Sequence, residues 1–99
     1  MVTEIAIIDV LPGHEAAFAA AFQKTGHQLL ATTPGCISVK MYRSSENPSR
    51  FTGVNEWESE KAHLENFRGS DRYIKYGEVL RPHLAVTPLV QHFDDVLDN

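Results

Sequence analysis

His63 and His92 are the two side chains in this sequence best suited to acid–base chemistry. A free imidazole has a pKa of about 6.5, so a histidine in a cavity can take up or release a proton at neutral pH. His63 lies in a segment with helical spacing, where a partly exposed position at the helix edge is the alternative to a cavity. His92 lies in a predicted strand, and the sequence leaves open whether it faces the helices or a second protein chain.

Asn55 and Trp57 stand at the end of another predicted strand and share one face of it, because side chains alternate along a strand. An asparagine in an apolar layer must find a hydrogen-bond partner, and that partner is either a backbone carbonyl or a substrate oxygen. Trp57 packs beneath the following helix, lines a cavity, or does both. Both residues are therefore candidates for a substrate pocket.

Aromatic side chains on the helices could complete such a pocket. Phe67 lies one helical turn after His63 and borders the same helix face. Tyr73 and Tyr76 follow in the next helical segment, where their hydroxyls could bind a substrate oxygen or reach water from a packed position. The five histidines include no pair at helical metal-site spacing, and no phosphate-binding glycine pattern or nucleophile elbow is present. We therefore expect neither a metal nor a nucleotide.

Hydrophobic spacing and turn residues predict the elements that position these side chains. The pair Pro34-Gly35 ends an alanine-rich helical segment, and Ser59 is placed to cap the helix that carries His63. The expected elements are a strand at 2–11, a helix at 14–32, strands at 36–43 and 50–58, helices at 60–67 and 71–80, and a strand at 86–93.

This β-α-β-β-α-β order predicts a ferredoxin-like α+β fold, with an antiparallel sheet that carries helices on one face. We expect a single domain over residues 1–99, with an acidic tail from about residue 94, and Pro88 predicts either an edge position or a bulge in the last strand. Ile5 and Ile7 alternate with Ala6 and Ile8, so both sheet faces are apolar, and one helical layer covers only one of them. We therefore expect a homodimer packed through the sheet face.

Composition limits the classes of partner. Net charge is −4 and the nine Lys and Arg residues are scattered, whereas a protein that binds a phosphate backbone normally carries a basic stripe. No apolar run approaches the ~20 residues that span a bilayer, and the N-terminal residues lack the pattern of a signal peptide. Cys36 is the single cysteine, so no internal disulfide can form. We expect a cytoplasmic protein that binds neither nucleic acid nor membranes.

Four stretches, taken in their order and spacing, resemble the antibiotic biosynthesis monooxygenase family of small dimeric α+β barrels. They are "LPGHEAAFAAAF", "PGCISVKMYRS", "FTGVNEWES" and "LRPHLAVTPLVQHF". The resemblance covers nearly the whole chain. It implies a pocket between sheet and helices, and the oxidation of aromatic substrates such as anthrones or quinols by O2 without flavin, metal or haem.

The resemblance implies roles for the candidate residues in a cofactor-independent monooxygenase that acts on a small aromatic or quinone-like molecule. His63 or His92 would take a proton, and Asn55, Tyr73 and Tyr76 would hold substrate oxygens. Many family members have a histidine where this sequence has Phe67. In this chain, Phe67 and Trp57 would form a wall of the pocket. The alternatives are a non-oxygenase enzyme on the same barrel, such as an isomerase, and a non-catalytic dimer that binds a small ligand.

Overall fold

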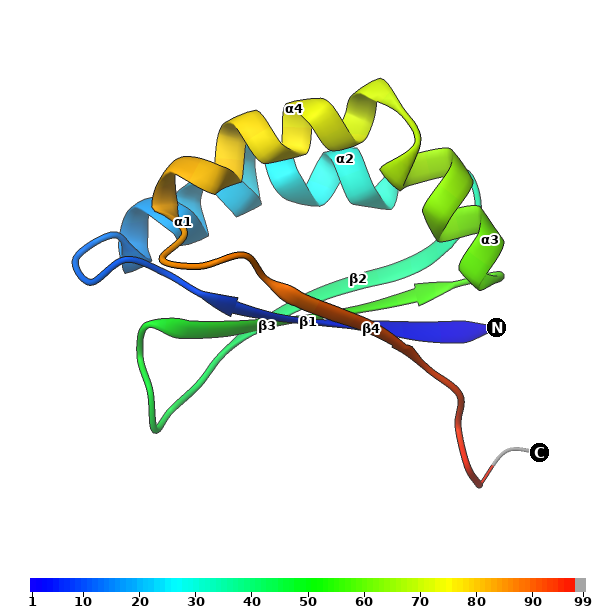
Figure 1. Ribbon diagram of the computed structural model, residues 1–99, viewed down its shortest axis with the longest axis horizontal. Coiled ribbons are helices and arrows are strands. Elements are labelled where there is room, and N and C mark those ends of the chain that lie inside the picture. The colour runs from blue at the N-terminus through cyan, green and yellow to red at the C-terminus, as the bar shows by residue number, and fades with distance from the viewer. Residues whose placement is uncertain (98–99) are drawn as a thin grey trace.

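The computed structural model describes residues 1–97 and contains one four-stranded antiparallel sheet with its helices on one face (Figure 1). The strand order is β2-β3-β1-β4, and the prediction of a ferredoxin-like α+β fold is confirmed. The strands are β1 (Val2–Asp9), β2 (Cys36–Arg43), β3 (Arg50–Trp57) and β4 (Leu89–Phe93). The helical elements are α1 (Glu15–Ala21), η1 (Phe22–Gly26), α2 (His27–Ala31), α3 (Glu60–Ala62), η2 (His63–Arg68), α4 (Asp71–Leu80) and η3 (Arg81–His83).

The sheet register brings polar residues of three strands together on the helix side. Side chains at alternate positions of β1 point toward the helices, and Glu4, Ala6 and Ile8 are the buried ones. Glu4 pairs with Asn55 of β3 on one side and with His92 of β4 on the other. Because directly paired residues of antiparallel strands share a face, these three side chains lie next to one another in an otherwise apolar layer.

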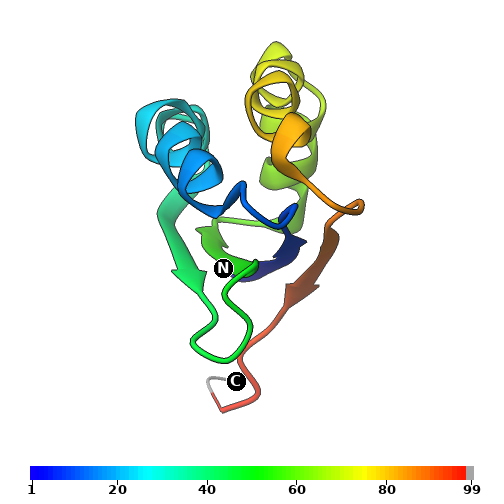
Figure 2. The ribbon, with the colours of Figure 1, turned by 90° about the vertical axis from the view of Figure 1, so that its left-hand side faces the viewer.

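Two helical arms cover this face of the sheet. In the end view they lie on its two sides (Figure 2). The first arm is a continuous run of α1, η1 and α2, in which η1 is π-helical, and the second contains α3, η2 and α4. The arms meet at Gly26, where a Cβ would lie in ordinary contact with the second arm, 3.4 Å from Tyr76 Cε1 and 3.5 Å from Leu80 Cδ1. The second arm begins at Ser59, whose Oγ accepts a hydrogen bond from the Ala62 N–H at 3.0 Å, so the predicted cap is confirmed.

The hydrophobic core fills the space between the first arm and the sheet. Phe18 is fully buried and its ring lies 4.8 Å from that of Phe51 on β3. Phe22 and Leu30 continue the buried stripe along the same helical run, and Leu80 extends it from the second arm.

Two expectations about the strands need correction. The last strand begins at Leu89 rather than at residue 86, because Pro88 has no N–H to donate to the ladder. It is an edge strand, which is one of the two alternatives that Pro88 predicts. In β2, regular alternation from Ile37 would place it on the same face as Val39, but a bulge between Cys36 and Ser38 shifts the register and leaves Ile37 53% exposed. Residues 94–97 lie outside the strands, and the rest of the predicted acidic tail, 98–99, lies outside the described residues.

The sheet face turned away from the helices, here called the outer sheet face, has no helix or strand of residues 1–97 packed over it (Figure 1). Half-buried Ile5 and Ile7 of β1 lie at its centre beside Val54 of β3. Tyr42 of β2 and Leu89 of β4 continue it to both edges and are 53% and 59% exposed. A large part of this surface is therefore apolar.

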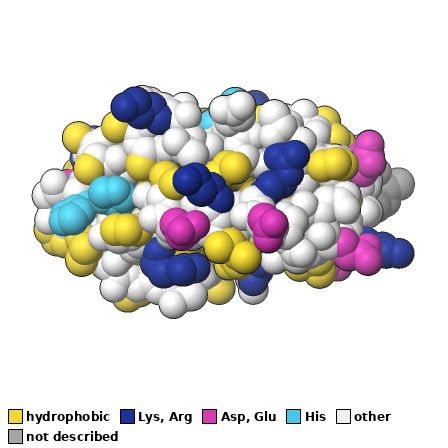
Figure 3. Space-filling model, turned by 90° about the horizontal axis from the view of Figure 1, so that it is seen from above, with side chains coloured by type: hydrophobic (Ala, Val, Ile, Leu, Met, Phe, Trp, Pro, Cys, Tyr) yellow, Lys and Arg dark blue, Asp and Glu magenta, His cyan; other side chains and the backbone are white. Residues whose placement is uncertain are grey.

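The helical face differs in character, with basic, acidic and apolar side chains interspersed (Figure 3). No basic stripe of the kind that binds a phosphate backbone crosses the face in this view. None of the helices within residues 1–97 has both the length and the apolar character needed to cross a membrane.

Candidate active site

A cavity of about 680 Å³ lies between the sheet and the two helical arms. Small-molecule sites in proteins typically measure ~300–1,000 Å³, so this cavity has the size of a ligand pocket. One side is formed by the segment 84–90, which leads from η3 into β4. The apolar part of the wall includes Ala6, Ile8, Phe18, Leu30, Met41, Phe67 and Leu80.

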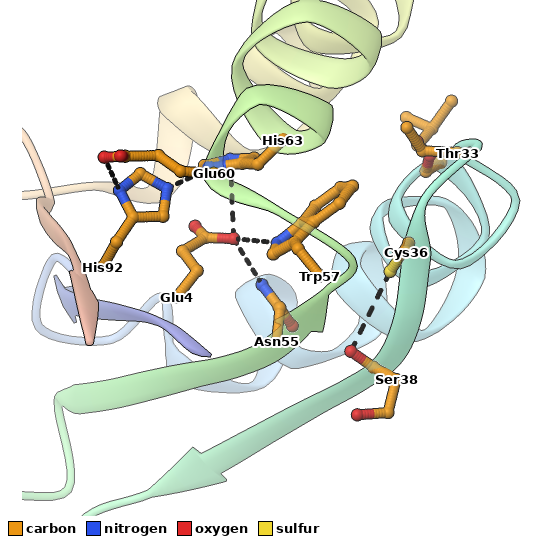
Figure 4. A network of polar contacts seen from close by, with 10 residues as sticks. Glu4, Thr33, Cys36, Ser38, Asn55, Trp57, Glu60, His63 and His92 are labelled. Atoms are coloured by element: carbon orange, nitrogen blue, oxygen red, sulfur yellow. Dashed lines mark hydrogen bonds and ion pairs between the residues drawn. The ribbon is translucent and has the colours of Figure 1, made fainter. Parts of the chain in front are cut away.

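Glu4 is the acidic centre of the site and is only 6% exposed. Its Oε1 accepts hydrogen bonds from Asn55 Nδ2 at 3.1 Å and from Trp57 Nε1 at 3.0 Å, and lies 3.5 Å from His63 Nε2 (Figure 4). These donors compensate for the removal of the carboxylate from water. Sequence reasoning missed Glu4, although its place in the β1 alternation, two residues before Ala6, marks it as a charged residue pointing into the core.

Asn55 is a lining residue of the cavity and carries an unused acceptor. The side chain is 4% exposed, and its Nδ2 must face Glu4, because a carboxylate only accepts hydrogen bonds. Its Oδ1 is buried and has no hydrogen-bond partner among residues 1–97. A buried acceptor without a partner costs about 1–3 kcal/mol, which a bound molecule carrying a hydroxyl or N–H group would recover.

His63 is buried, with 1% of its side chain exposed, so the alternative of a partly exposed position at the helix edge is wrong. Its ring stacks on that of Trp57 with centroids 4.7 Å apart, and Phe67 lies 6.0 Å away on the same helix face. Burial lowers the pKa of His63, although the Glu4 carboxylate acts in the opposite direction. The imidazole is therefore neutral at neutral pH.

Both ring nitrogens of His63 face polar partners. Nε2 is directed at Glu4, and Nδ1 lies 2.8 Å from Nε2 of His92 (Figure 4). The other nitrogen of His92, Nδ1, lies 3.1 Å from Oε1 of Glu60 at the start of α3. The side chain of His92 is 16% exposed, and that of Glu60 is 62% exposed. A continuous row of titratable groups thus extends from the pocket to the surface.

Tyr73 and Tyr76 approach the cavity from α4, with their rings edge-on to Phe67 at 5.6 Å and 5.2 Å. Neither hydroxyl has a hydrogen-bond partner within residues 1–97. Desolvation, together with the negative charge of Glu4, raises the pKa of Tyr76, so its hydroxyl stays protonated and can donate. The pocket therefore offers an amide acceptor and phenolic donors between aromatic walls.

The cavity brings together five of the seven residues proposed from the sequence. Asn55, His63, Phe67, Tyr73 and Tyr76 line it. Trp57 is fully buried behind His63, and His92 reaches the pocket only through His63, so neither is a lining residue. Within the part of the chain that the structure describes, no group of three or more His, Cys, Asp or Glu side chains is placed to hold a metal ion.

The fold and the site define a small α+β protein with a cavity of ligand size between its sheet and its helices. The sequence model of the antibiotic biosynthesis monooxygenase family matches residues 1–79, and the chain belongs to this family. The resemblance noted in the sequence is thereby confirmed.

Individual relatives agree with this assignment. The uncharacterised protein YczJ of Bacillus subtilis is 30% identical over 96 residues, which is 97% of this chain and 100% of YczJ. A crystal structure from Bordetella bronchiseptica, assigned to the same family, is 35% identical with a TM-score of 0.91, over 96% of both chains. SnoaB of Streptomyces nogalater, a cofactor-independent oxygenase, shares the fold with a TM-score of 0.81 at 19% identity, over 95% of this chain and 91% of SnoaB.

Proposed function

We propose that this protein is a cofactor-independent monooxygenase that oxidises a small aromatic or quinol-like substrate with O2. The observation that carries the proposal is Asn55, which donates from Nδ2 to the Glu4 carboxylate and has an unpartnered Oδ1, in a pocket whose lining is otherwise mostly apolar and aromatic. Membership of the family, and the description of SnoaB as a cofactor-independent oxygenase, support the same reaction class.

The reaction needs little from the protein beyond binding, proton transfer and exclusion of water. Loss of a proton from the substrate leaves an electron-rich anion that reduces O2. For a methylene carbon between two rings, one oxygen atom becomes the new carbonyl oxygen, and the other leaves as water with the two hydrogens of that carbon. A dry pocket favours this sequence because the anion is stabilised by fixed donors rather than by solvent.

The lining residues have roles that follow from their atoms. Asn55 Oδ1 accepts a hydrogen bond from a substrate hydroxyl, while Tyr73 and Tyr76 donate to the oxygen on which negative charge develops. Phe67 packs against the flat face of the ring system. Of the two proposed histidines, His63 borders the substrate and His92 acts through it.

The first test is oxygen uptake by the purified protein across a panel of anthrones, naphthols and quinols, with a chelator present. We expect saturable uptake above the rate of autoxidation, lost on heat denaturation. Asn55→Leu should lower kcat/KM by about 10–100-fold, the effect of one lost hydrogen bond to a buried group. Asn47→Leu, in the exposed loop between β2 and β3, is the matched control and should change nothing.

Saturable binding of panel compounds without oxygen uptake would contradict the monooxygenase and favour an isomerase-like enzyme or a ligand-binding protein.

The proposal also includes the assembly of the protein and its cellular compartment. We propose a homodimer packed through the outer sheet face, and the cytoplasm as the compartment that suits a protein whose only cysteine, Cys36, is unpaired.

A further inference from the structure

We propose that Glu4 takes the proton from the bound substrate, and that His63, His92 and Glu60 form a relay that carries this proton between the pocket and the solvent. The first part rests on the proposed function, because it requires a substrate with an acidic hydrogen. The second part rests only on the geometry of the four side chains (Figure 4).

The choice of Glu4 over His63 follows from the occupancy of the ring nitrogens. Nε2 of His63 faces Glu4 and Nδ1 faces His92, so the imidazole has no free nitrogen to present to a substrate. Glu4 lines the cavity beside the unpartnered Oδ1 of Asn55. A substrate held by Asn55 would therefore find a carboxylate, rather than an imidazole, as its nearest proton acceptor.

The relay connects four separate elements at hydrogen-bond range or close to it. Successive contacts measure 3.5 Å from Glu4 in β1 to His63 in η2, 2.8 Å from His63 to His92 in β4, and 3.1 Å from His92 to Glu60 in α3. Side-chain exposure is 8% at Glu4 and 1% at His63, and then rises to 16% at His92 and 62% at Glu60. The row thus leads from buried side chains at the pocket to an exposed carboxylate at the surface.

Protons balance along this row. The substrate C–H bond breaks, its electron pair stays on the substrate, and an O–H bond forms on Glu4. Glu4 passes a proton to Nε2 of His63, whose Nδ1 proton moves to Nε2 of His92, whose Nδ1 proton moves to Glu60 and then to water. The same transfers in reverse return a proton to the pocket when the second oxygen atom leaves as water. This restores the starting tautomers, in which His63 and His92 each carry their proton on Nδ1.

The surrounding groups suit this role. Burial lowers the pKa of His63, and a neutral imidazole can accept a proton on one nitrogen while it releases one from the other. The rings of Trp57 and Phe67 lie against that of His63, with centroids 4.7 Å and 6.0 Å away. Trp57 also donates to Glu4 and holds the carboxylate in place.

The relay can be tested without turnover, by NMR of protein labelled with ¹⁵N-histidine. The measured quantity is the rate at which the ring N–H protons of His63 exchange with water. We expect His92→Ala to slow this exchange by about tenfold or more, and added imidazole, which can enter the space left near the surface, to restore it. An unchanged rate, or a slowed rate that imidazole fails to restore, would overturn the relay.

The role of Glu60, the last group of the relay, is tested with two variants that each remove one negative charge. Glu60→Gln keeps an oxygen near His92 but cannot carry a proton, whereas Glu78→Gln makes the same change at an exposed position on α4. Slower His63 exchange in Glu60→Gln, with no change in Glu78→Gln, is the expected result. Equal rates in the two variants would remove Glu60 from the relay.

The role of Glu4 is tested by proton abstraction in the absence of oxygen. Anthrone is incubated anaerobically with the protein in D2O, and loss of its methylene proton signal is followed by NMR. Glu4→Gln retains an oxygen that accepts from Asn55 and Trp57, and we expect it to slow the catalysed exchange by about 10²-fold or more. Exchange that the wild-type protein does not accelerate, or that survives in Glu4→Gln, would overturn this role. Catalysed exchange without oxygen uptake would instead contradict the monooxygenase alone.

Discussion

At the scale of single residues, His63 couples the stability of the fold to pH. Burial lowers its pKa below the unfolded value of 6.5. The negative charges of Glu4 and Glu60 raise this pKa, and the positive charges of His92 and Arg68 lower it further. As pH falls below 6.5, the unfolded chain binds a proton at this site that the folded chain does not. The free energy of unfolding should therefore decrease through this range.

Urea denaturation between pH 7.5 and 5.5 measures this effect. His63→Gln should flatten the pH dependence of the free energy of unfolding, because glutamine does not titrate. His27→Gln, at an exposed position on α2, should leave the slope as it is in the wild type. A wild-type slope that persists in His63→Gln would assign the pH dependence to other groups.

The sequence indicates most of the residues that line the pocket, since Asn55 follows from strand alternation and Phe67 from helical spacing after His63. It does not indicate the centre of the site. Glu4 lies in a strand rich in β-branched residues, and the other inward positions of this strand are apolar. Its hydrogen-bond donors, Asn55 and Trp57, are 51 and 53 residues away along the chain. Only the strand register shows that they meet.

At the scale of elements, the turn before β2 holds the helix that carries His63. Gly35 has φ of +91°, and its carbonyl accepts from the Glu58 N–H at 2.8 Å. A Cβ on Gly35 would lie 2.7 Å from Cβ of Ala62, the residue that precedes His63. Asn66 also donates to the carbonyl of Pro34 at 2.8 Å. The turn thus packs directly against α3 and η2.

Gly35→Ala should therefore destabilise the protein by about 2–4 kcal/mol, through left-handed backbone strain and the collision with Ala62. Gly13→Ala is the matched control, because Gly13 has the same φ of +91° but a Cβ there would have no other atom within 4 Å. It should cost about 1–2 kcal/mol from the backbone strain alone. Equal losses in urea denaturation would show that contact with α3 adds nothing.

The order of elements follows from hydrophobic spacing, but local irregularities do not. The bulge at Cys36 and the π-helical segment that contains His63 and Phe67 each add a residue to a regular repeat. Such insertions are decided by packing against distant elements, which the local pattern does not contain. The π-helical segment bears directly on the site, because η2 supplies His63 and Phe67 to the lining of the pocket.

At the scale of the whole molecule, the apolar outer sheet face determines the expected assembly. Ile5 and Ile7 lie at its centre, next to Val54, and the helices cover only the opposite face. Contiguous apolar surface of this kind on a sheet is normally buried by a second protein surface. A second copy of the chain offers a matching surface through a two-fold axis, since the same residues meet in both directions.

A lysine at the centre of this face should separate the proposed dimer. Light scattering of the wild-type protein at low micromolar concentration should give about twice the chain mass of 11.1 kDa. Ile5→Lys places two charges in the dry interface and should give the mass of a single chain, whereas Ile74→Lys makes the same change at a position on α4 that is 62% exposed and should leave the dimer intact. Circular dichroism would establish that both variants are folded. A monomeric wild-type mass, or a dimer that survives in folded Ile5→Lys, would place the partner surface elsewhere or remove it.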